Sequence, residues 1–180
     1  MSIRIENRAT IKAPANLEPV IQKIIETVPK EHLRGIIKIV LVDKINPQMR
    51  IDLPAGQELP GLYHPKMGPT GPWCEIALGA LIPQEGFWKK LAARMNFKPN
   101  LAQLLLMLFG QHFQLTQTHG VKKTQLETGV RKYTEKYYEV WRESEAGFRA
   151  KLFKPLRPYI DKWTRNLAKK YAEEQKKKAG

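Results

Sequence analysis

Apolar residues recur at helical spacing in the first and middle parts of the chain. After Asn16, a good N-cap residue, they fall every three or four positions as far as Val28, and Pro29 follows. This pattern predicts a helix over residues 17–28. A second amphipathic stripe predicts a helix over residues 84–95, and the Lys-Pro-Asn sequence at 98–100 predicts a break after it.

The segment at 101–118 is apolar on most of its circumference, which is typical of a central, buried helix. His119 and Gly120 are its expected end, because glycine suits the left-handed position that follows a helix. Thr124 and Glu127 then fit a capping box, so that a new helix is expected to start at Thr124. Its apolar stripe consists of Leu126, Val130, Tyr133, Tyr137, Val140 and Trp141, and the helix is expected to continue to about Phe153.

Strand patterns occupy the region between the first two helices. Residues 36–42 form a nearly continuous β-branched run that predicts a buried strand, and residues 49–53 alternate as a half-buried strand would. Residues 54–72 contain five prolines and four glycines, from which we expect a long constrained loop without regular structure. Residues 73–78 are a third strand candidate, expected at an edge of the sheet.

These elements predict an α+β fold, with a small three- to four-stranded sheet and helices on one side. The expected organisation is one domain over residues 1–145, a basic helical extension over 146–172 and a flexible lysine-rich tail over 173–180. No apolar run approaches the roughly 20 residues that span a bilayer, and the start of the chain has no apolar core of a signal peptide. We therefore expect a cytoplasmic protein. Cys74 is the single cysteine, which leaves no partner for an internal disulfide.

Charge changes this picture most. The chain has 31 Lys and Arg against 17 Asp and Glu, a formal net charge of +14. Residues 120–180 carry 17 basic and 8 acidic side chains, which makes the last third the cationic part. Such a balance favours polyanionic partners.

The chain resembles small single-domain metallopeptidases of the gluzincin type. The resemblance lies in Pro-Lys-Glu-His-Leu-Arg-Gly at 29–35, Leu-Pro-Gly-Leu-Tyr-His-Pro at 59–65 and Glu-Ile-Ala-Leu-Gly at 75–79. Leu-Phe-Gly-Gln-His at 108–112 stands in the place of the zinc motif, and the segment 119–127 leads to Glu127 as the counterpart of the third ligand. The resemblance implies a zincin-like fold.

The sequence departs from the family at the motif itself. In His-Glu-x-x-His the two histidines bind zinc and the glutamate activates water, but here Leu108 and Phe109 replace the first histidine and the glutamate. Only His112 remains, so we expect no peptidase activity by this mechanism, no metal and no cofactor. A cluster of His64, Cys74 and His112, with or without Glu127, is the alternative way to rebuild a metal site. The competing interpretations are a hydrogen-bonded core histidine at 112 and the capping box at Glu127.

Basic and aromatic residues interleave in the predicted extension, as they do on surfaces that bind nucleic acid. The alternative is a solvated basic face whose aromatic residues pack on the core. The leading hypothesis is a non-catalytic, zincin-like protein that binds nucleic acid, RNA included, or a ribonucleoprotein. The alternatives are a divergent metal-dependent hydrolase and a protein–protein adaptor that accepts an extended peptide beside residues 73–78. The candidate nucleic-acid-binding residues are Arg149, Lys151, Lys154, Arg157, Lys162, Arg165, Lys169 and Lys170.

Overall fold

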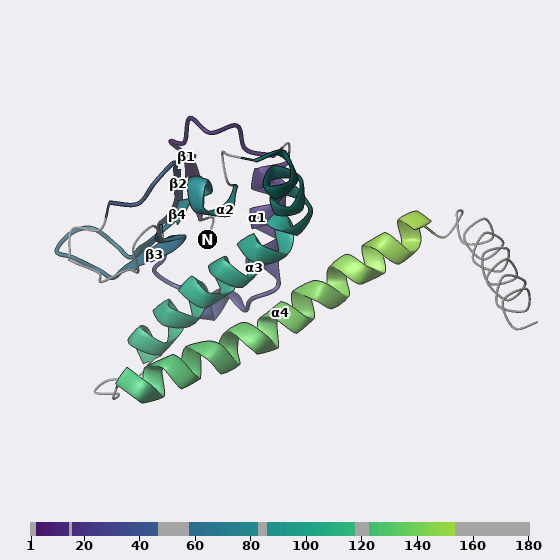
Figure 1. Ribbon diagram of the computed structural model, residues 1–180. Coiled ribbons are helices and arrows are strands. Elements are labelled where there is room, and N and C mark those ends of the chain that lie inside the picture. The colour runs from purple at the N-terminus through teal and green to yellow at the C-terminus, as the bar shows by residue number, and fades with distance from the viewer. Residues whose placement is uncertain (1–2, 15, 47–57, 83–85, 118–122, 154–180) are drawn as a thin grey trace, which may run out of the picture. The chain divides into compact units, whose positions relative to one another are not determined.

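A computed structural model describes residues 3–14, 16–46, 58–82, 86–117 and 123–153 (Figure 1). The described elements form an α+β fold, as the sequence predicts. The chain divides into two compact units, Met1–Trp141 and Arg142–Gly180. Within the first unit the described order is β1 (Arg4–Asn7), α1 (Leu17–Glu26), the 3-10 helix η1 (Lys30–Leu33), β2 (Lys38–Val42), β3 (Gly61–His64), β4 (Trp73–Ala77), α2 (Leu78–Leu81), α3 (Phe87–Gln117) and most of α4 (Lys123–Phe153).

The four strands form one mixed sheet in the order β1-β2-β4-β3. Strands β1, β2 and β4 are parallel, and β3 runs antiparallel to β4. The short helix α2 follows β4 directly, where Gly79 donates a backbone hydrogen bond to the Asp43 carbonyl at 3.0 Å.

The two faces of the sheet differ in character because side chains alternate along a strand. Helices α1 and α3 lie on one side of the sheet (Figure 1). The side chains of Ile5, Ile39, Cys74 and Tyr63 form one row in register across the strands and belong to the core. The next row, on the opposite face, consists of Arg4, Lys38, Trp73 and His64.

Helix α1 confirms the predicted first helix, since it buries Leu17, Ile21 and Ile24. Its N-cap works differently from the prediction. Asn16 has a left-handed backbone, with φ 73° and ψ 27°, and its side chain makes no capping hydrogen bond. Asparagine tolerates this conformation better than other residues with a side chain. Asn16 therefore forms the left-handed turn before α1 and does not cap the helix with its side chain.

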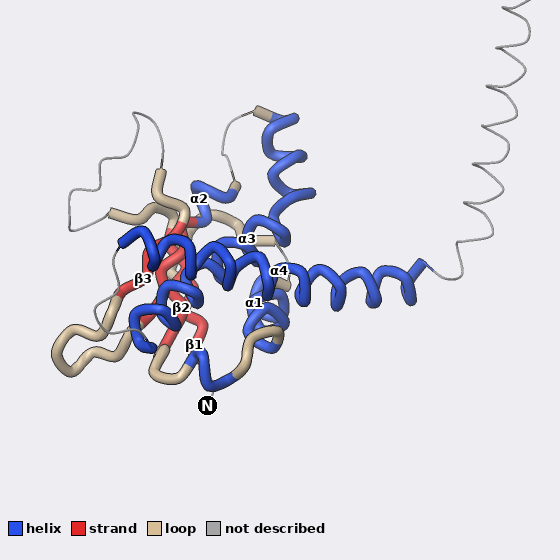
Figure 2. Tube along the Cα trace, turned by 90° about the horizontal axis from the view of Figure 1, so that it is seen from below, coloured by secondary structure: helices blue, strands red, loops and turns tan. Residues whose placement is uncertain are grey.

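Helix α3 corrects the predicted break at residues 98–100. It is continuous from Phe87 to Gln117 and contains Pro99. The proline removes one helical hydrogen bond and crowds the carbonyl four residues earlier, which bends helices. Figure 2 shows that α3 changes direction along its length. Phe97 and Leu101 on either side are buried, and this packing offsets the cost of the proline.

Helix α4 confirms the helix predicted from Thr124 to about Phe153. It begins at Lys123, so Thr124 lies inside the first turn and is not the N-cap of the predicted capping box. Helices α3 and α4 approach closely at Gly110, where a Cβ atom would lie 3.1 Å from a ring carbon of Tyr133. At Gly129 a Cβ atom would lie 2.8 Å from the Gln114 side chain. Glycine at both positions therefore lets the two backbones come together.

Two strand predictions are wrong and one lies outside the described residues. Strand β3 falls within the segment 54–72 that was expected to be an irregular loop. Strand β4 confirms the candidate at 73–78, but β2 and β3 flank it, so it is not an edge. The predicted strand at 49–53 lies outside the described residues.

Candidate functional site

His112 is a neutral, fully hydrogen-bonded histidine in the core of the first unit. It is 1% exposed. Its Nε2 donates to the Arg34 carbonyl at 3.1 Å, and its Nδ1 accepts from the Tyr63 hydroxyl at 2.9 Å. These two bonds fix the tautomer that carries the proton on Nε2. Burial lowers the pKa of His112, although the bond to Arg34 opposes this effect. The structural interpretation of this histidine is confirmed.

Leu108 and Phe109 are also core residues, 1% and 0% exposed. Neither lines a described pocket, so the helix face on which a metal and a catalytic base were expected is buried. In the second half of α3 the residues that line a described pocket are Gln103, Met107, Gln111 and Leu115, which are spaced four apart. The face of α3 that lines this pocket therefore lies one position before the residues at which the gluzincin resemblance places its motif.

This pocket, which we call the helix groove, has a volume of about 560 Å³. It lies between the end of β3, helix α3 and the first half of α4. Its wall is mainly apolar, and Glu127 and Arg131 bring one charge of each sign. The lining residues are Tyr63, Pro65, Gln103, Met107, Gln111, Leu115, Leu126, Glu127, Val130, Arg131 and Thr134. A pocket of this size and composition suits an apolar side chain or a small organic molecule.

Strand β3 brings a backbone edge to the helix groove. The Ala77 amide donates to the Pro60 carbonyl at 2.9 Å, which marks these residues as a hydrogen-bonded pair. Hydrogen-bonded and non-hydrogen-bonded pairs alternate in an antiparallel ladder, so the backbone N–H and C=O of Tyr63 point away from β4. Among the described strands β3 pairs with β4 alone. The outer strands of the described sheet are β1 and β3, so the edge beside the helix groove is β3 and not residues 73–78.

The alternative metal cluster of His64, Cys74 and His112 is not assembled. Cys74 and His112 lie on the helix side of the sheet, but His64 points to the opposite face because it follows Tyr63 in the strand. There its ring stacks on Trp73, with centroids 3.8 Å apart, and its Nε2 lies 2.9 Å from a Glu75 carboxylate oxygen. Burial raises the pKa of the Cys74 thiol to about 12. Across the described ranges no three His, Cys, Asp or Glu side chains are close enough to hold a metal ion.

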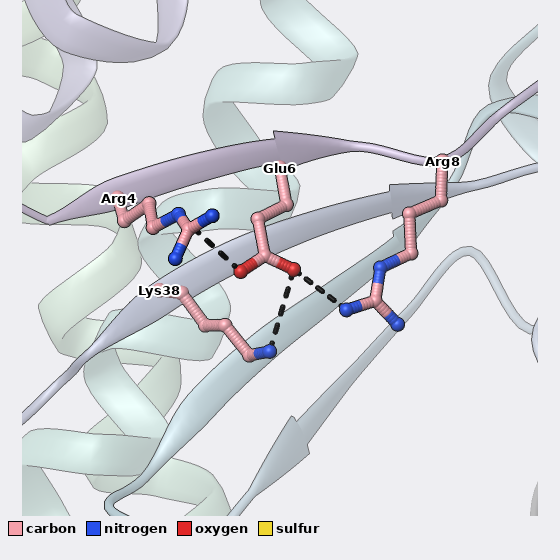
Figure 3. Close-up of polar contacts among 4 residues, drawn as sticks. All are labelled: Arg4, Glu6, Arg8 and Lys38. Carbon is pink, nitrogen blue, oxygen red and sulfur yellow. Dashed lines mark hydrogen bonds and ion pairs between the residues drawn. The ribbon is translucent and has the colours of Figure 1, made fainter.

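Basic side chains gather on the face of the sheet opposite the helices (Figure 3). The Glu6 carboxylate accepts from Arg8 at 2.7 Å and from Lys38 at 3.4 Å, and it lies 3.5 Å from the Arg4 guanidinium. The hydrogen bond from Arg8, with the nearby charges of Lys38 and Arg4, holds the pKa of Glu6 below its ordinary value. Three cations around one carboxylate leave a positive surplus. This cluster was not predicted from the sequence, and the signal that could have found it is the alternation of Arg4 and Glu6 in β1 with Arg8 just after the strand.

The predicted nucleic-acid-binding residues lie at and beyond the end of the described chain. Arg149 and Lys151 belong to α4. The other six, Lys154, Arg157, Lys162, Arg165, Lys169 and Lys170, lie outside the described residues. Residues 123–147 of α4 carry five basic and five acidic side chains, whereas residues 148–180 carry 11 basic and 3 acidic ones. The cationic character thus begins near the end of the described helix.

Comparison with protein-family models, curated protein sequences and solved structures finds no match to this chain. Within the described part of the chain, no helix is both long and apolar enough to cross a membrane.

Proposed function

We propose that this protein is a non-catalytic binding protein whose C-terminal unit contacts nucleic acid without sequence preference. The observation that carries the proposal is the division of the chain after Trp141. The unit Arg142–Gly180 has 39 residues with 12 basic and 5 acidic side chains, a net charge of +7. Half of the net charge of +14 therefore lies in about a fifth of the chain. Lysine and arginine at this density neutralise phosphates and release counterions.

The test is charge reversal in the C-terminal unit. Changing Arg157, Lys162, Arg165 and Lys169 to Glu should weaken binding to unrelated RNA and DNA sequences alike. Each lost phosphate contact should lower the slope of log K against log salt by about 0.7 to 0.9. Fluorescence anisotropy at several salt concentrations measures both quantities. The matched control reverses four exposed basic residues of the first unit, Lys30, Arg34, Lys66 and Lys132, and so makes the same change in net charge.

Equal losses in the two quadruple variants would mean that net charge, and not the C-terminal unit, determines binding. Unchanged affinity in the C-terminal variant would place the contact elsewhere, with the cluster of Arg4, Arg8 and Lys38 as the next candidate. No binding by the parent protein at low salt would overturn the proposal.

A second function, binding of an extended peptide, is favoured by the position of the helix groove beside the free edge of β3. A peptide strand could pair with the outward backbone of Tyr63 and place an apolar side chain in the groove. This assignment moves the adaptor hypothesis from residues 73–78 to β3. The divergent hydrolase gains no such support, because Glu127 is the sole carboxylate and no histidine or cysteine is found among the described residues of the groove.

The groove can be tested with peptides selected from a displayed random library. Leu115→Arg places a charge in the groove and should reduce affinity for the selected peptides at least tenfold, since an apolar contact is lost and a charge is desolvated. The control is Val140→Arg, because Leu115 is 46% exposed and Val140 is 44% exposed, outside the groove. Absence of any selected peptide, or equal losses in both variants, would exclude this function.

A further inference from the structure

A second pocket of the first unit lies at the start of α1, away from the helix groove. Its volume is about 460 Å³. The segment before α1, the first turns of α1, the residue after α2 and the first half of α3 contribute to it. The lining residues are Lys12, Ala13, Pro14, Asn16, Leu17, Val20, Ile82, Arg94, Phe97 and Lys98. We call it the α1–α3 pocket.

The charges of the α1–α3 pocket are all positive. Lys12, Arg94 and Lys98 line it, and no acidic residue does. Arg94 and Lys98 are four residues apart on α3 and so project from the same side of the helix. None of the three forms an ion pair with a described carboxylate, in contrast to Arg4, Arg8 and Lys38, which share Glu6. Three cations at one concave site produce a positive potential that attracts a multivalent anion.

The rest of the wall is apolar. Leu17, Ile82 and Phe97 are buried residues of the core, and Val20 and Ala13 are partly buried beside them. A small inorganic anion would leave this surface uncovered, whereas a ligand with a carbon body would cover it. The volume lies within the range of small-molecule sites, roughly 300 to 1,000 Å³.

We propose that the α1–α3 pocket binds a phosphate monoester that carries an apolar or aromatic group. Lys12, Arg94 and Lys98 hold the phosphate dianion, with the guanidinium able to donate two parallel hydrogen bonds, and the apolar wall contacts the body of the ligand. The phosphate can belong to a small molecule or to the 5′ end of a nucleic-acid strand. This inference does not depend on nucleic-acid binding by the C-terminal unit, which concerns other residues.

The test uses phenyl phosphate as the probe for the full-length protein, with inorganic phosphate and phenol as partial probes. Titration calorimetry should show that phenyl phosphate binds more tightly than either part. The triple variant Lys12→Gln, Arg94→Gln, Lys98→Gln should lose at least tenfold in affinity, because three charge-assisted contacts are removed. The control triple variant Lys30→Gln, Lys66→Gln, Lys132→Gln makes the same change in net charge on exposed residues and should bind as the parent does.

Competition then identifies the source of the phosphate. A 5′-phosphorylated oligonucleotide that displaces phenyl phosphate, when its 5′-hydroxyl counterpart does not, supports a strand end as the ligand. Displacement by neither oligonucleotide, with phenyl phosphate binding intact, supports a small molecule. The proposal is overturned if phenyl phosphate does not bind, if phenol binds equally well, or if both triple variants lose affinity to the same extent.

Discussion

The double variant Leu108→His, Phe109→Glu is expected to unfold the protein at neutral pH. Both side chains are fully buried in the described core, and neither reaches a pocket. A buried carboxylate without a partner costs several kcal/mol, and the loss of the Phe109 ring adds a few more. Domains are stable by only about 5 to 15 kcal/mol, so the sum removes most of the stability. Circular dichroism during thermal unfolding measures the effect.

The control places two histidines on the neighbouring face of the same helix. Met107→His with Gln111→His leaves the fully buried residues of the core unchanged, because Gln111 and the partly buried Met107 both line the helix groove. This variant should fold, and with Glu127 it offers the two histidines and one carboxylate of a catalytic zinc site. Zinc binding by this variant, measured by calorimetry, would show that the groove-lining positions of α3 can share one ion with Glu127. A folded, zinc-binding Leu108→His, Phe109→Glu protein would instead show that the assigned orientation of α3 is wrong.

Replacing His112 by Ala should lower the free energy of unfolding by about 3 kcal/mol, as expected when a buried partner is removed and a cavity remains. The variant leaves the Tyr63 hydroxyl and the Arg34 carbonyl without their partner. Tyr63→Phe removes one of the two hydrogen bonds and should cost about 1 kcal/mol. Urea unfolding at pH 7 measures both. A smaller decrease in the free energy of unfolding for His112→Ala than for Tyr63→Phe would show that His112 contributes little to stability.

The same histidine should make stability depend on pH. Burial lowers the pKa of both His112 and His32 below the ordinary value of 6.5. The unfolded chain therefore takes up protons first as the pH falls, and stability rises with pH wherever the unfolded state binds more protons. The neutral forms of the two histidines contribute their full stabilisation of the folded state above pH 6.5. This stabilisation is lost as the pH falls through the lowered pKa of each histidine in the folded protein. His112→Ala should flatten this loss between pH 7 and 5, and greater stability at pH 5 than at pH 7 would contradict it.

The sequence predicts the elements whose apolar pattern has a single interpretation. Helix α1 has one apolar face, β2 is a short apolar run, and β4 is a mostly apolar run that only Glu75 interrupts. Strand β3 was missed because the prolines and glycines of residues 54–72 predicted an irregular loop. Pro60 and Pro65 lie just outside this strand of four residues and so do not interrupt it. Gly61 pairs with Ile76 in the sheet, and a Cβ atom at this position would lie 2.9 Å from the Leu104 side chain of α3. Only the tertiary contact explains that glycine.

The orientation of α3 could not be obtained from periodicity. Residues 104–109 are apolar without exception, so no face of the helix is marked as the one toward solvent or a pocket. The gluzincin resemblance places its motif at residues 108–112, whereas the residues of α3 that line the helix groove are Gln103, Met107, Gln111 and Leu115. His112 was identified correctly as a core histidine, but its partners come from β3 and from the residue after η1, far away in the sequence.

The close approach of α3 and α4 at Gly110 has a consequence for how this sequence can vary. Any side chain at position 110 would press on the ring of Tyr133, because the nearest ring carbon lies 3.1 Å from a Cβ atom there. A larger residue at 110 thus requires a smaller one at 133, or it moves the helices apart and widens the groove. In related chains the residues at positions 110 and 133 should therefore change together. Their combined size would indicate how closely α3 and α4 pack beside the groove.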